Sequence, residues 1–540
     1  MKNISLIGYS DKLSLRPGET ISFKVSSTLK KPFIASLKRS ISADPNPKGM
    51  GIVEEDASKY FKTSSFKSRK QSFNPGSYAI SKKPLKVSIK KNLNFSVIIF
   101  PTFFSSKKQT ILSFDNIEIY INSNGAITIG IGDKSISLKQ PLTIRTWYKI
   151  KVNILLDGNV SISQSNLKNK NEKDLINKGK ILLNKVIFGN VSLATIISKG
   201  VSCNHFNGKI ESPKIIVDGK KIGEWDLSKN TSSTFVDSIK GPKLLLKNFP
   251  TRAVTGSKWD GSEMNWKHKP KHYAAIHFHD DDIYDFEWKT DFKLTIPKNI
   301  PSGIYVMRIN CEGCEDAMPF FVAPAITKIK TKICILISTF TYSIYGNHAR
   351  VDYQDGWLNR IKEWNAYPYN PANYKEYGLS TYNYHSDGSG ICHSSHRRPL
   401  FNLRPGYVTF GGSNIPCSGL RHFQADSHLI SWLHNKGFEY EIITDEQLHQ
   451  DGFKAIKDYK TVITGSHPEY HTKETLDALR EFRDSGGSLN YLGGNGFYWR
   501  IAIHKENKSI LEIRRPEGGI RAWASEPGEA YNAFDGTYGG

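Results

Sequence analysis

The strongest constraint on the fold is a change in hydrophobic pattern near residue 331. Before it, apolar and polar residues mostly alternate, as in strands with one buried face. Residues 332–338, Lys-Ile-Cys-Ile-Leu-Ile-Ser, instead contain a continuous apolar run. Such a run is typical of a strand that is buried on both faces of a parallel sheet covered by helices. The C-terminal third is therefore predicted to differ in fold class from the rest.

Helices and strands alternate after this first strand. Two segments with apolar residues at helical spacing, over 422–436 and after the predicted N-cap Thr472, alternate with short apolar strands over 438–443, 459–464 and 488–492. This order predicts a parallel sheet with right-handed crossovers. We expect residues 329–540 to form a doubly wound α/β catalytic domain, similar to the class I amidotransferase fold.

Three β-rich regions precede this domain. Residues 1–60 alternate as a short N-terminal β segment, and residues 61–228 contain many short strands separated by turns. The second pattern predicts a β-sandwich of the laminin-G or concanavalin-like type. In residues 229–328 the last strand pair resembles the final hairpin of an immunoglobulin-like module. The chain is therefore predicted to be multidomain.

The charge balance is strongly basic, at +23. A basic balance can indicate a polyanionic partner, but here the lysines are spread along the first half, with no zinc finger, RNP-like segment or basic helix. We therefore predict no nucleic-acid partner, and note that a basic surface could equally meet an acidic subunit.

The cysteine content and the N-terminal residues indicate in which cellular compartment the protein is expected. Six cysteines are few for a disulfide framework in a chain of 540 residues, and Cys311-Glu-Gly-Cys314 lacks the second pair that a zinc site needs. It is interpreted as a turn. The first residues carry no apolar signal-peptide region, and no run approaches the roughly 20 apolar residues of a membrane span. A cytoplasmic protein without membrane contact is predicted.

Polar and aromatic loops follow three of the predicted strands, over 339–347, 465–470 and 493–496. In open parallel sheets, ligands bind beyond the carboxyl ends of the strands, so these loops should line one crevice. The connection over 346–421 is long and rich in Tyr, His, Asp and Gly, as expected of a functional loop. No nucleophile elbow is present, and Cys392 is not at a strand-to-helix turn, which argues against a Cys-His-Glu triad.

A second polar run, His277-Phe-His-Asp-Asp-Asp282, precedes the α/β domain. Its two histidines alternate and would share one face of a strand, so the run could ligate a metal ion. A solvated loop is the favoured interpretation.

Five segments of the C-terminal third carry a family resemblance. They are Ser338-Thr-Phe-Thr-Tyr-Ser-Ile-Tyr-Gly-Asn, Gly378-Leu-Ser-Thr-Tyr-Asn-Tyr-His-Ser-Asp-Gly-Ser-Gly, Gly465-Ser-His-Pro-Glu-Tyr, Leu492-Gly-Gly-Asn-Gly and Ala533-Phe-Asp-Gly. Together they resemble the large (beta) subunit of N,N-dimethylformamidase. The resemblance implies hydrolysis of a small N-substituted amide to a carboxylate and an amine.

The resemblance also implies a mononuclear iron, taken as ferric, on two tyrosines and a glutamate. The matching positions here are Glu469, Tyr345 and Tyr382. Tyr384 stays open as an alternative to Tyr382, and Tyr342 as an alternative to Tyr345. His467 and Asn495 match polar positions beside the metal, so His467 could move a proton and Asn495 could stabilise an oxyanion.

The implied partners are a small amide substrate, a small subunit and further copies of the chain. Because the family's large subunit extends beyond the point that matches residue 540, we expect the α/β domain to be C-terminally truncated. The alternative hypothesis is a non-enzymatic protein, in which the sandwich binds carbohydrate and the α/β domain is a degenerate scaffold.

Overall fold

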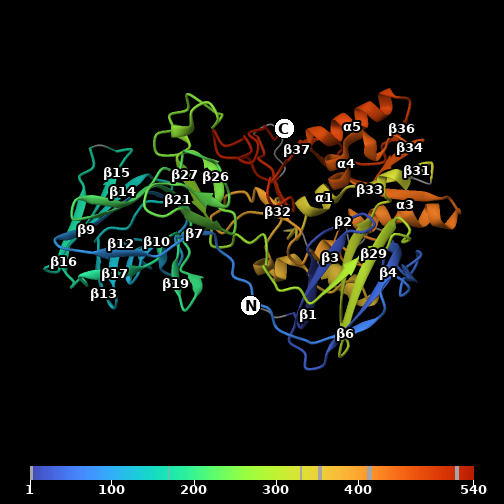
Figure 1. The fold of residues 1–540 in the computed structure, drawn as a ribbon, viewed down its shortest axis with the longest axis horizontal. Helices are drawn as coiled ribbons and strands as arrows, with labels where there is room; N and C mark the ends of the chain where they lie inside the picture. Colours follow the sequence, from blue (N-terminus) through green and yellow to red (C-terminus); the bar gives the residue numbers. More distant parts are fainter. Residues whose placement is uncertain are drawn as a thin grey trace.

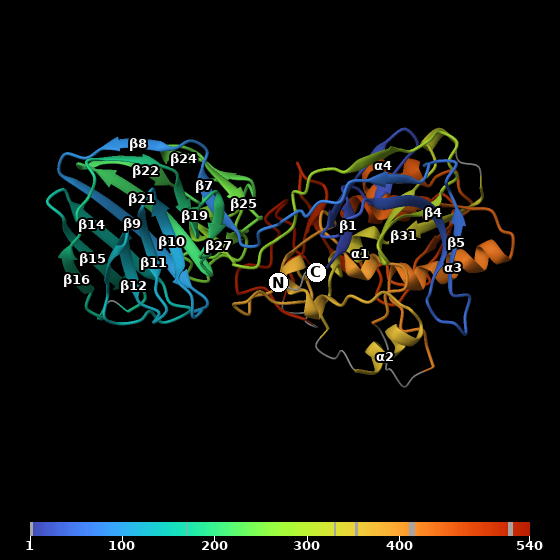
Figure 2. The same ribbon diagram turned by 90° about the horizontal axis from the view of Figure 1, so that it is seen from below.

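The computed structural model describes residues 4–169, 171–328, 331–350, 355–409, 416–516 and 522–539. It has two lobes, a β-sandwich on the left of Figure 1 and a mixed lobe on the right. The mixed lobe combines an N-terminal β module with the C-terminal α/β domain. Figure 2, seen from below, shows the same separation, with loops of the C-terminal third lying between the lobes. The protein is thus β-rich and multidomain, as predicted.

The sandwich lobe consists of two antiparallel sheets whose facing apolar side chains form the largest core cluster. This core results from the strict alternation of buried and partly exposed residues along the strands: in β9, every second residue is buried. The first sheet contains β7 (Tyr78–Ser81), β10 (Gln109–Phe114), β11 (Ile117–Ile121), β12 (Ile127–Ile131), β13 (Lys134–Ser137), β18 (Val191–Leu193), β23 (Phe235–Val236) and β25 (Leu244–Lys247). The second contains β9 (Asn92–Pro101), β14 (Tyr148–Leu155), β15 (Asn159–Asn166), β16 (Leu175–Lys180), β21 (Gly208–Val217), β22 (Lys220–Trp225), β24 (Ser238–Lys240), β26 (Thr251–Val254) and β27 (Ala275–Phe278). Two small ribbons pair β8 (Leu85–Ser88) with β17 (Val186–Gly189) and β19 (Ile196–Ser198) with β20 (Val201–Cys203).

The N-terminal β module is built from two separated parts of the chain. One sheet has the order β1 (Leu6–Ser10), β3 (Thr20–Ser27) and β28 (Phe292–Thr295). The other joins β2 (Ser14–Leu15), β30 (Cys314–Val322), β29 (Gly303–Cys311), β4 (Phe33–Ala43), β5 (Ile52–Asp56) and β6 (Ser64–Phe66). Strand pairing therefore crosses the predicted boundary at residue 60, and β26 and β27 carry the sandwich past the predicted boundary at 228. Cys311 and Cys314 face each other at the β29–β30 turn, as expected for a turn, and both are free thiols.

The α/β domain contains a four-stranded parallel sheet, in the order β33 (Tyr440–Thr444), β31 (Ile333–Ile337), β34 (Thr461–Thr464) and β36 (Ser488–Asn490). Side chains of β31 alternate between two core clusters. Ile335 and Ile337 pack with α3, whereas Cys334 and Leu336 pack with α4 and α5. Its helices are α1 (Thr339–Ile344), α2 (Asp355–Glu363), α3 (Phe423–Asn435), α4 (Asp445–Asp451) and α5 (Lys473–Asp484). The strand run at 332–338 is thus buried on both faces, as the sequence predicts.

Local sequence determines where the helices begin. The Thr472 side chain accepts a hydrogen bond from the Thr475 amide, which confirms the predicted N-cap of α5. Thr444 caps α4 with a complete capping box. Short 3-10 turns lie at η1 (Pro270–His272), η2 (Ile326–Lys328), η3 (Pro371–Asn373), η4 (Lys375–Tyr377), η5 (Phe401–Leu403) and η6 (Gly452–Ala455). The remaining strands are β32 (His393–Ser395), β35 (Tyr470–His471), β37 (Trp499–Arg500), β38 (Ala502–Ile503) and β39 (Ile510–Glu512).

Residues near the C-terminal end of the chain connect the two lobes. Lys209 of β21 forms a buried ion pair with Glu529, with 2.5 Å between Nζ and Oε1. The Arg514 guanidinium donates to the backbone carbonyl of Arg252, at 2.7 Å, on β26. These contacts fix the sandwich against the α/β domain.

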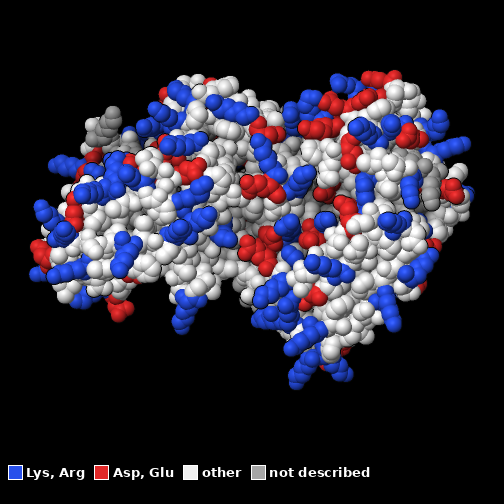
Figure 3. Space-filling model, in the orientation of Figure 1, with Lys and Arg blue, Asp and Glu red and all other residues white. Residues whose placement is uncertain are grey.

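The surface carries both signs of charge. On the face in Figure 3, Lys and Arg side chains are spread over both lobes among Asp and Glu. None of the described helices is both long and apolar enough to cross a membrane.

A buried ion pair holds the N-terminal module on the α/β domain. Asp316 of β30 accepts from Arg404 Nε at 2.8 Å and from the backbone amide of Gly8 at 2.8 Å. Both charged side chains are almost fully buried. Breaking a buried pair leaves an uncompensated charge, which is strongly destabilising.

We therefore expect Asp316→Ala to lower the free energy of unfolding by about 3–5 kcal/mol, because Arg404 stays buried without its partner. Urea unfolding followed by circular dichroism measures the change. Asp56→Ala removes the exposed pair with Lys38 and should leave the midpoint unchanged. Equal midpoints for the two variants would contradict the role of the buried pair.

Candidate active site

Three predicted residues meet at the carboxyl end of the parallel sheet. Tyr345 is the C-cap of α1, which directly follows β31, and Glu469 lies between β34 and β35. Tyr382 comes from the long connection between α1 and α3. The Tyr345 hydroxyl donates to Glu469 Oε2 at 2.8 Å, and the Tyr382 hydroxyl donates to Oε1 at 3.1 Å. One carboxylate thus receives both phenols.

The two tyrosine rings are fixed by stacking. Their centroids are 4.1 Å apart with an interplanar angle of 17°. The Tyr382 hydroxyl also lies 2.6 Å from the Tyr470 hydroxyl, which accepts from Arg515 at 2.9 Å. The guanidinium of Arg515 lies 4.4 Å from the Tyr382 ring centroid. The buried guanidinium cation of Arg515 therefore lies next to Tyr382 and Tyr470.

Burial and hydrogen bonding set the protonation states. Burial would raise the pKa of Glu469, but hydrogen bonds from His467, Tyr345 and Tyr382 outweigh it and hold the pKa below its ordinary value. Burial, together with the charge of Glu469, raises the pKa of Tyr345 and of Tyr382 above that of a free phenol, while Arg515 opposes the rise at Tyr382. The resting site is therefore one carboxylate between two neutral phenols.

His467 contacts this carboxylate, and Asn495 lies in a loop that packs on the turn before Glu469. His467 Nε2 is 2.9 Å from Glu469 Oε2, and the ring is partly exposed. Asn495 is exposed, in a glycine-rich loop whose backbone packs on the turn before Glu469: Gly494 donates to the Ser466 carbonyl at 3.0 Å. No described residue forms a hydrogen bond to the Asn495 side chain.

The two alternative tyrosines point elsewhere. Tyr384 is half exposed, and its hydroxyl donates to the Ala522 carbonyl. Tyr342 is buried, and its hydroxyl donates to Asp426. Neither hydroxyl has a hydrogen bond to Glu469.

Two residues beside the site, Arg515 and His422, arrive from segments outside the strand-end loops and carry no sequence signal. Tyr470 ends a predicted strand-end loop, but nothing in the sequence marks it as a partner of Tyr382. The His422 ring centroid is 4.3 Å from that of Tyr345, and its buried Nε2 has no hydrogen-bond partner. Only the positive φ of 53° at His422 marks it as unusual, and backbone angles are not readable from sequence.

The fold and site define a β-rich multidomain protein with a carboxylate and two phenols at the ends of a parallel sheet. Comparison with known proteins identifies the family. The family model described as N,N-dimethylformamidase beta subunit-like, C-terminal, matches residues 251–540. The chain belongs to this family.

Two curated relatives match over the whole chain. The N,N-dimethylformamidase beta subunit of Paracoccus aminophilus is 31% identical over 602 aligned positions, which cover 100% of this chain and 78% of that protein. The protein of the same name from an Alcaligenes species is 32% identical over the same extent. Among solved structures, a SAP-like pentraxin from Limulus polyphemus matches with a TM-score of 0.21 at 14% identity, covering 27% of this chain and 73% of that one. A likeness this weak carries no inference.

The turn before Glu469 depends on a close approach to α3. Asp426 Oδ1 accepts from the Ser466 amide at 2.5 Å, and a Cβ added at Gly465 would lie under 3.0 Å from the Asp426 carboxylate. Only glycine leaves room for this contact. The position of Glu469 therefore depends on residue 465.

Gly465→Ala should displace the turn and destabilise the fold by about 1–3 kcal/mol, the usual range for overpacking. Thermal unfolding and the crystal structure of the variant measure the two effects. At Gly49 a new methyl group would meet its nearest atom, the Asn46 carbonyl oxygen, at 3.6 Å, so Gly49→Ala is the matched control. An unchanged position of Glu469 in the Gly465→Ala structure would refute this dependence.

Proposed function

We propose that this chain is the catalytic subunit of a hydrolase that cleaves a small N-substituted amide, such as a dimethylformamide-like compound, to a carboxylate and an amine. Family membership supports amide hydrolysis in general. The observation that carries the proposal is the convergence of both phenols on the two oxygens of Glu469.

Tyr345, Tyr382 and Glu469 would hold a single ferric iron. The residues present fit such an ion, because two phenol oxygens and a carboxylate are hard donors and suit a hard cation. When bound, iron supplies a Lewis acid that polarises the amide carbonyl and makes water more acidic. Arg515, which lowers the cost of negative charge on Tyr382, would help that phenol to lose its proton on metal binding.

His467 and Asn495 would serve the proton transfer and the developing charge. Amide hydrolysis adds water to the carbonyl carbon and breaks the C–N bond, and the leaving nitrogen must gain a proton. His467 is hydrogen-bonded through Nε2 and partly exposed, which supports a role in which it would hold and return that proton. Asn495 could donate from its side-chain amide to the carbonyl oxygen of the substrate.

The proposal extends to fold and assembly. The helix-covered sheet around β31 supports a doubly wound, class I amidotransferase-like assignment for the α/β domain. Both curated relatives are named as beta subunits, which supports assembly of this chain with a smaller second subunit and with further copies of itself. Size-exclusion chromatography with light scattering of the chain, expressed alone and with candidate small subunits, tests the assembly.

The ligand set predicts a spectroscopic signature. We expect iron-loaded protein to show visible tyrosinate-to-iron absorption. Tyr345→Phe, Tyr382→Phe and Glu469→Gln should each lose the band and most of the iron, because each removes one donor. Tyr384→Phe is the matched control and should keep both, since its hydroxyl faces Ala522. Colourless, iron-free wild-type protein that is folded and was grown with iron would refute the iron proposal.

His467→Gln should lower kcat by about 10²–10⁴-fold while the iron content stays the same, because a positioned acid or base contributes that range. Steady-state hydrolysis of dimethylformamide and related amides, with iron measured on the same samples, separates the two effects. His268→Gln changes an exposed histidine of the other lobe and serves as control. If kcat is retained in His467→Gln, the proton role lies with another group.

A further inference from the structure

Four of the six residues in the run His277–Asp282 are buried, which corrects its interpretation as a solvated loop. His277 on β27, His279 and Asp282 are all less than 10% exposed. They face Asp387 and His385 of the long connection between α1 and α3. The cluster therefore lies where the sandwich lobe meets the α/β domain, far along the chain from Glu469.

Two carboxylates in this cluster are fully enclosed. The side chains of Asp282 and Asp387 have no exposed area, and their ion pairs among the described residues are all with histidines. A buried carboxylate is costly unless a positive charge or a metal ion compensates it. Burial would lower the pKa of His385, but the charges of Asp281 and Asp282 outweigh it and raise the pKa to about 10, so one positive charge serves the two enclosed carboxylates.

The distances suit one small cation. Asp387 Oδ2 lies 3.0 Å from His277 Nε2 and 3.8 Å from His279 Nε2, and the three atoms all lie within 4.8 Å of one another. Ligand atoms about 2.0–2.1 Å from a tetrahedral ion are about 3.3 Å apart, which falls between the two distances. Small rotations of the side chains would bring the three donors to a metal.

Asp282 orients one of the two imidazoles. Its Oδ2 lies 3.1 Å from His279 Nδ1 and also accepts from Ser77 Oγ at 2.6 Å, while Tyr284 donates to Oδ1 at 3.0 Å. A carboxylate on Nδ1 places the proton there and leaves Nε2 free to ligate, which is the usual arrangement behind a metal-bound histidine.

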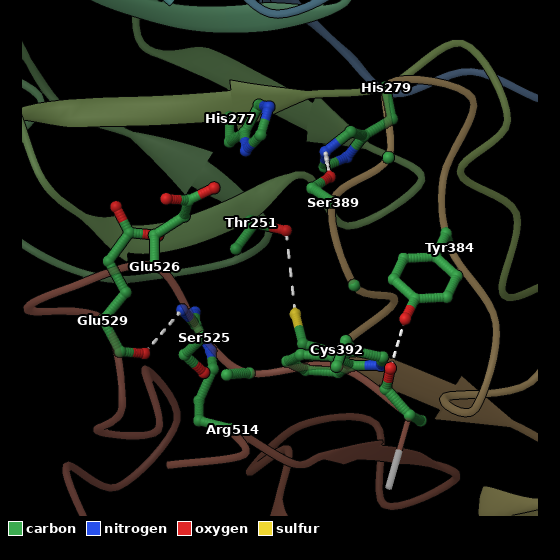
Figure 4. Close-up of a pocket in the computed structure, with 15 residues that line it drawn as sticks. Thr251, His277, His279, Tyr384, Ser389, Cys392, Arg514, Ser525, Glu526 and Glu529 are labelled. Atoms are coloured by element: carbon green, nitrogen blue, oxygen red, sulfur yellow. Dashed lines mark hydrogen bonds between the residues drawn. The ribbon is translucent and has the colours of Figure 1, made fainter. Parts of the chain in front are cut away.

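The open side of the triad faces a cavity of about 350 Å³. Figure 4 shows His277, His279 and Ser389 in the upper part of this cavity's lining, with Thr251 and Cys392 below them. Ser389 Oγ lies 3.1 Å from His279 Nε2. A fourth ligand, either this hydroxyl or water, is therefore at hand.

We propose that His277, His279 and Asp387 form a second metal site, for a divalent transition cation such as zinc, between the sandwich and the α/β domain. Two imidazoles and one carboxylate suit zinc, with the fourth position toward the cavity. Coordination through His277 Nε2 requires the tautomer that carries the ring proton on Nδ1, so the proton that Nε2 shares with Asp387 moves to the other ring nitrogen. The site uses none of the residues proposed for iron.

The test uses the full chain in a Glu469→Gln background, so that the proposed iron site does not contribute. After treatment with a chelator, zinc titration by calorimetry should show one saturable equivalent, and cobalt(II) should give the visible bands of a tetrahedral ion. His277→Gln and Asp387→Asn should each weaken binding by at least about 100-fold, and Asp282→Asn by about 10–100-fold. Circular dichroism and thermal unfolding check that each variant is folded.

His385→Gln is the matched control, because this histidine belongs to the adjacent triad with His279 and Asp282 but is not a proposed ligand. It should bind zinc as the parent does. Absence of a saturable equivalent and of tetrahedral cobalt bands in the parent would overturn the proposal without any variant. Loss of binding in His385→Gln, with binding kept in His277→Gln, would overturn it in favour of the adjacent triad.

Discussion

The arrangement of the C-terminal half depends on one constraint, the burial of β31 on both faces. Cys334 and Leu336 pack toward α4 and α5, and Ile335 and Ile337 toward α3, so none of these side chains can be polar. Functional groups are therefore displaced to the strand ends. The chain places Tyr345 one short helix after β31, and the neighbouring β34 leads to Glu469. Hydrophobic packing thus decides where the carboxylate and the phenols can meet.

Part of this arrangement was predictable from sequence. The loops that hold Glu469 and Tyr345 follow strands whose apolar runs are visible in the sequence, and the position of Thr472 predicts the start of α5. The choice of Glu469, Tyr345 and Tyr382 within those loops came from the family resemblance, and no local pattern distinguishes Tyr382 from Tyr384. The segment after β31 was expected to be a loop, whereas it contains α1.

Other parts were not predictable, because they depend on contacts between distant residues. Arg515 reaches Tyr470 from a segment with no regular pattern. His277 and Asp387 are 110 residues apart, and a run of His and Asp looks the same in sequence whether solvated or buried. Strand pairing between distant segments is equally hard to predict from sequence. Strand β4 pairs with β29 although more than 250 residues separate them, so the sequence predicts the N-terminal segment and the hairpin as separate domains.

The path of the chain between the lobes has a mechanical consequence. The sandwich is inserted into the N-terminal module, between β6 and β28, and its entering and leaving segments are hydrogen-bonded to each other: the Gly76 amide donates to the Asp282 carbonyl at 2.9 Å, and the Ser77 amide donates to the His279 carbonyl at 2.9 Å. A single flexible linker would allow the lobes to swivel. Two segments that are hydrogen-bonded to each other resist torsion, so the sandwich is held in a fixed orientation relative to the mixed lobe.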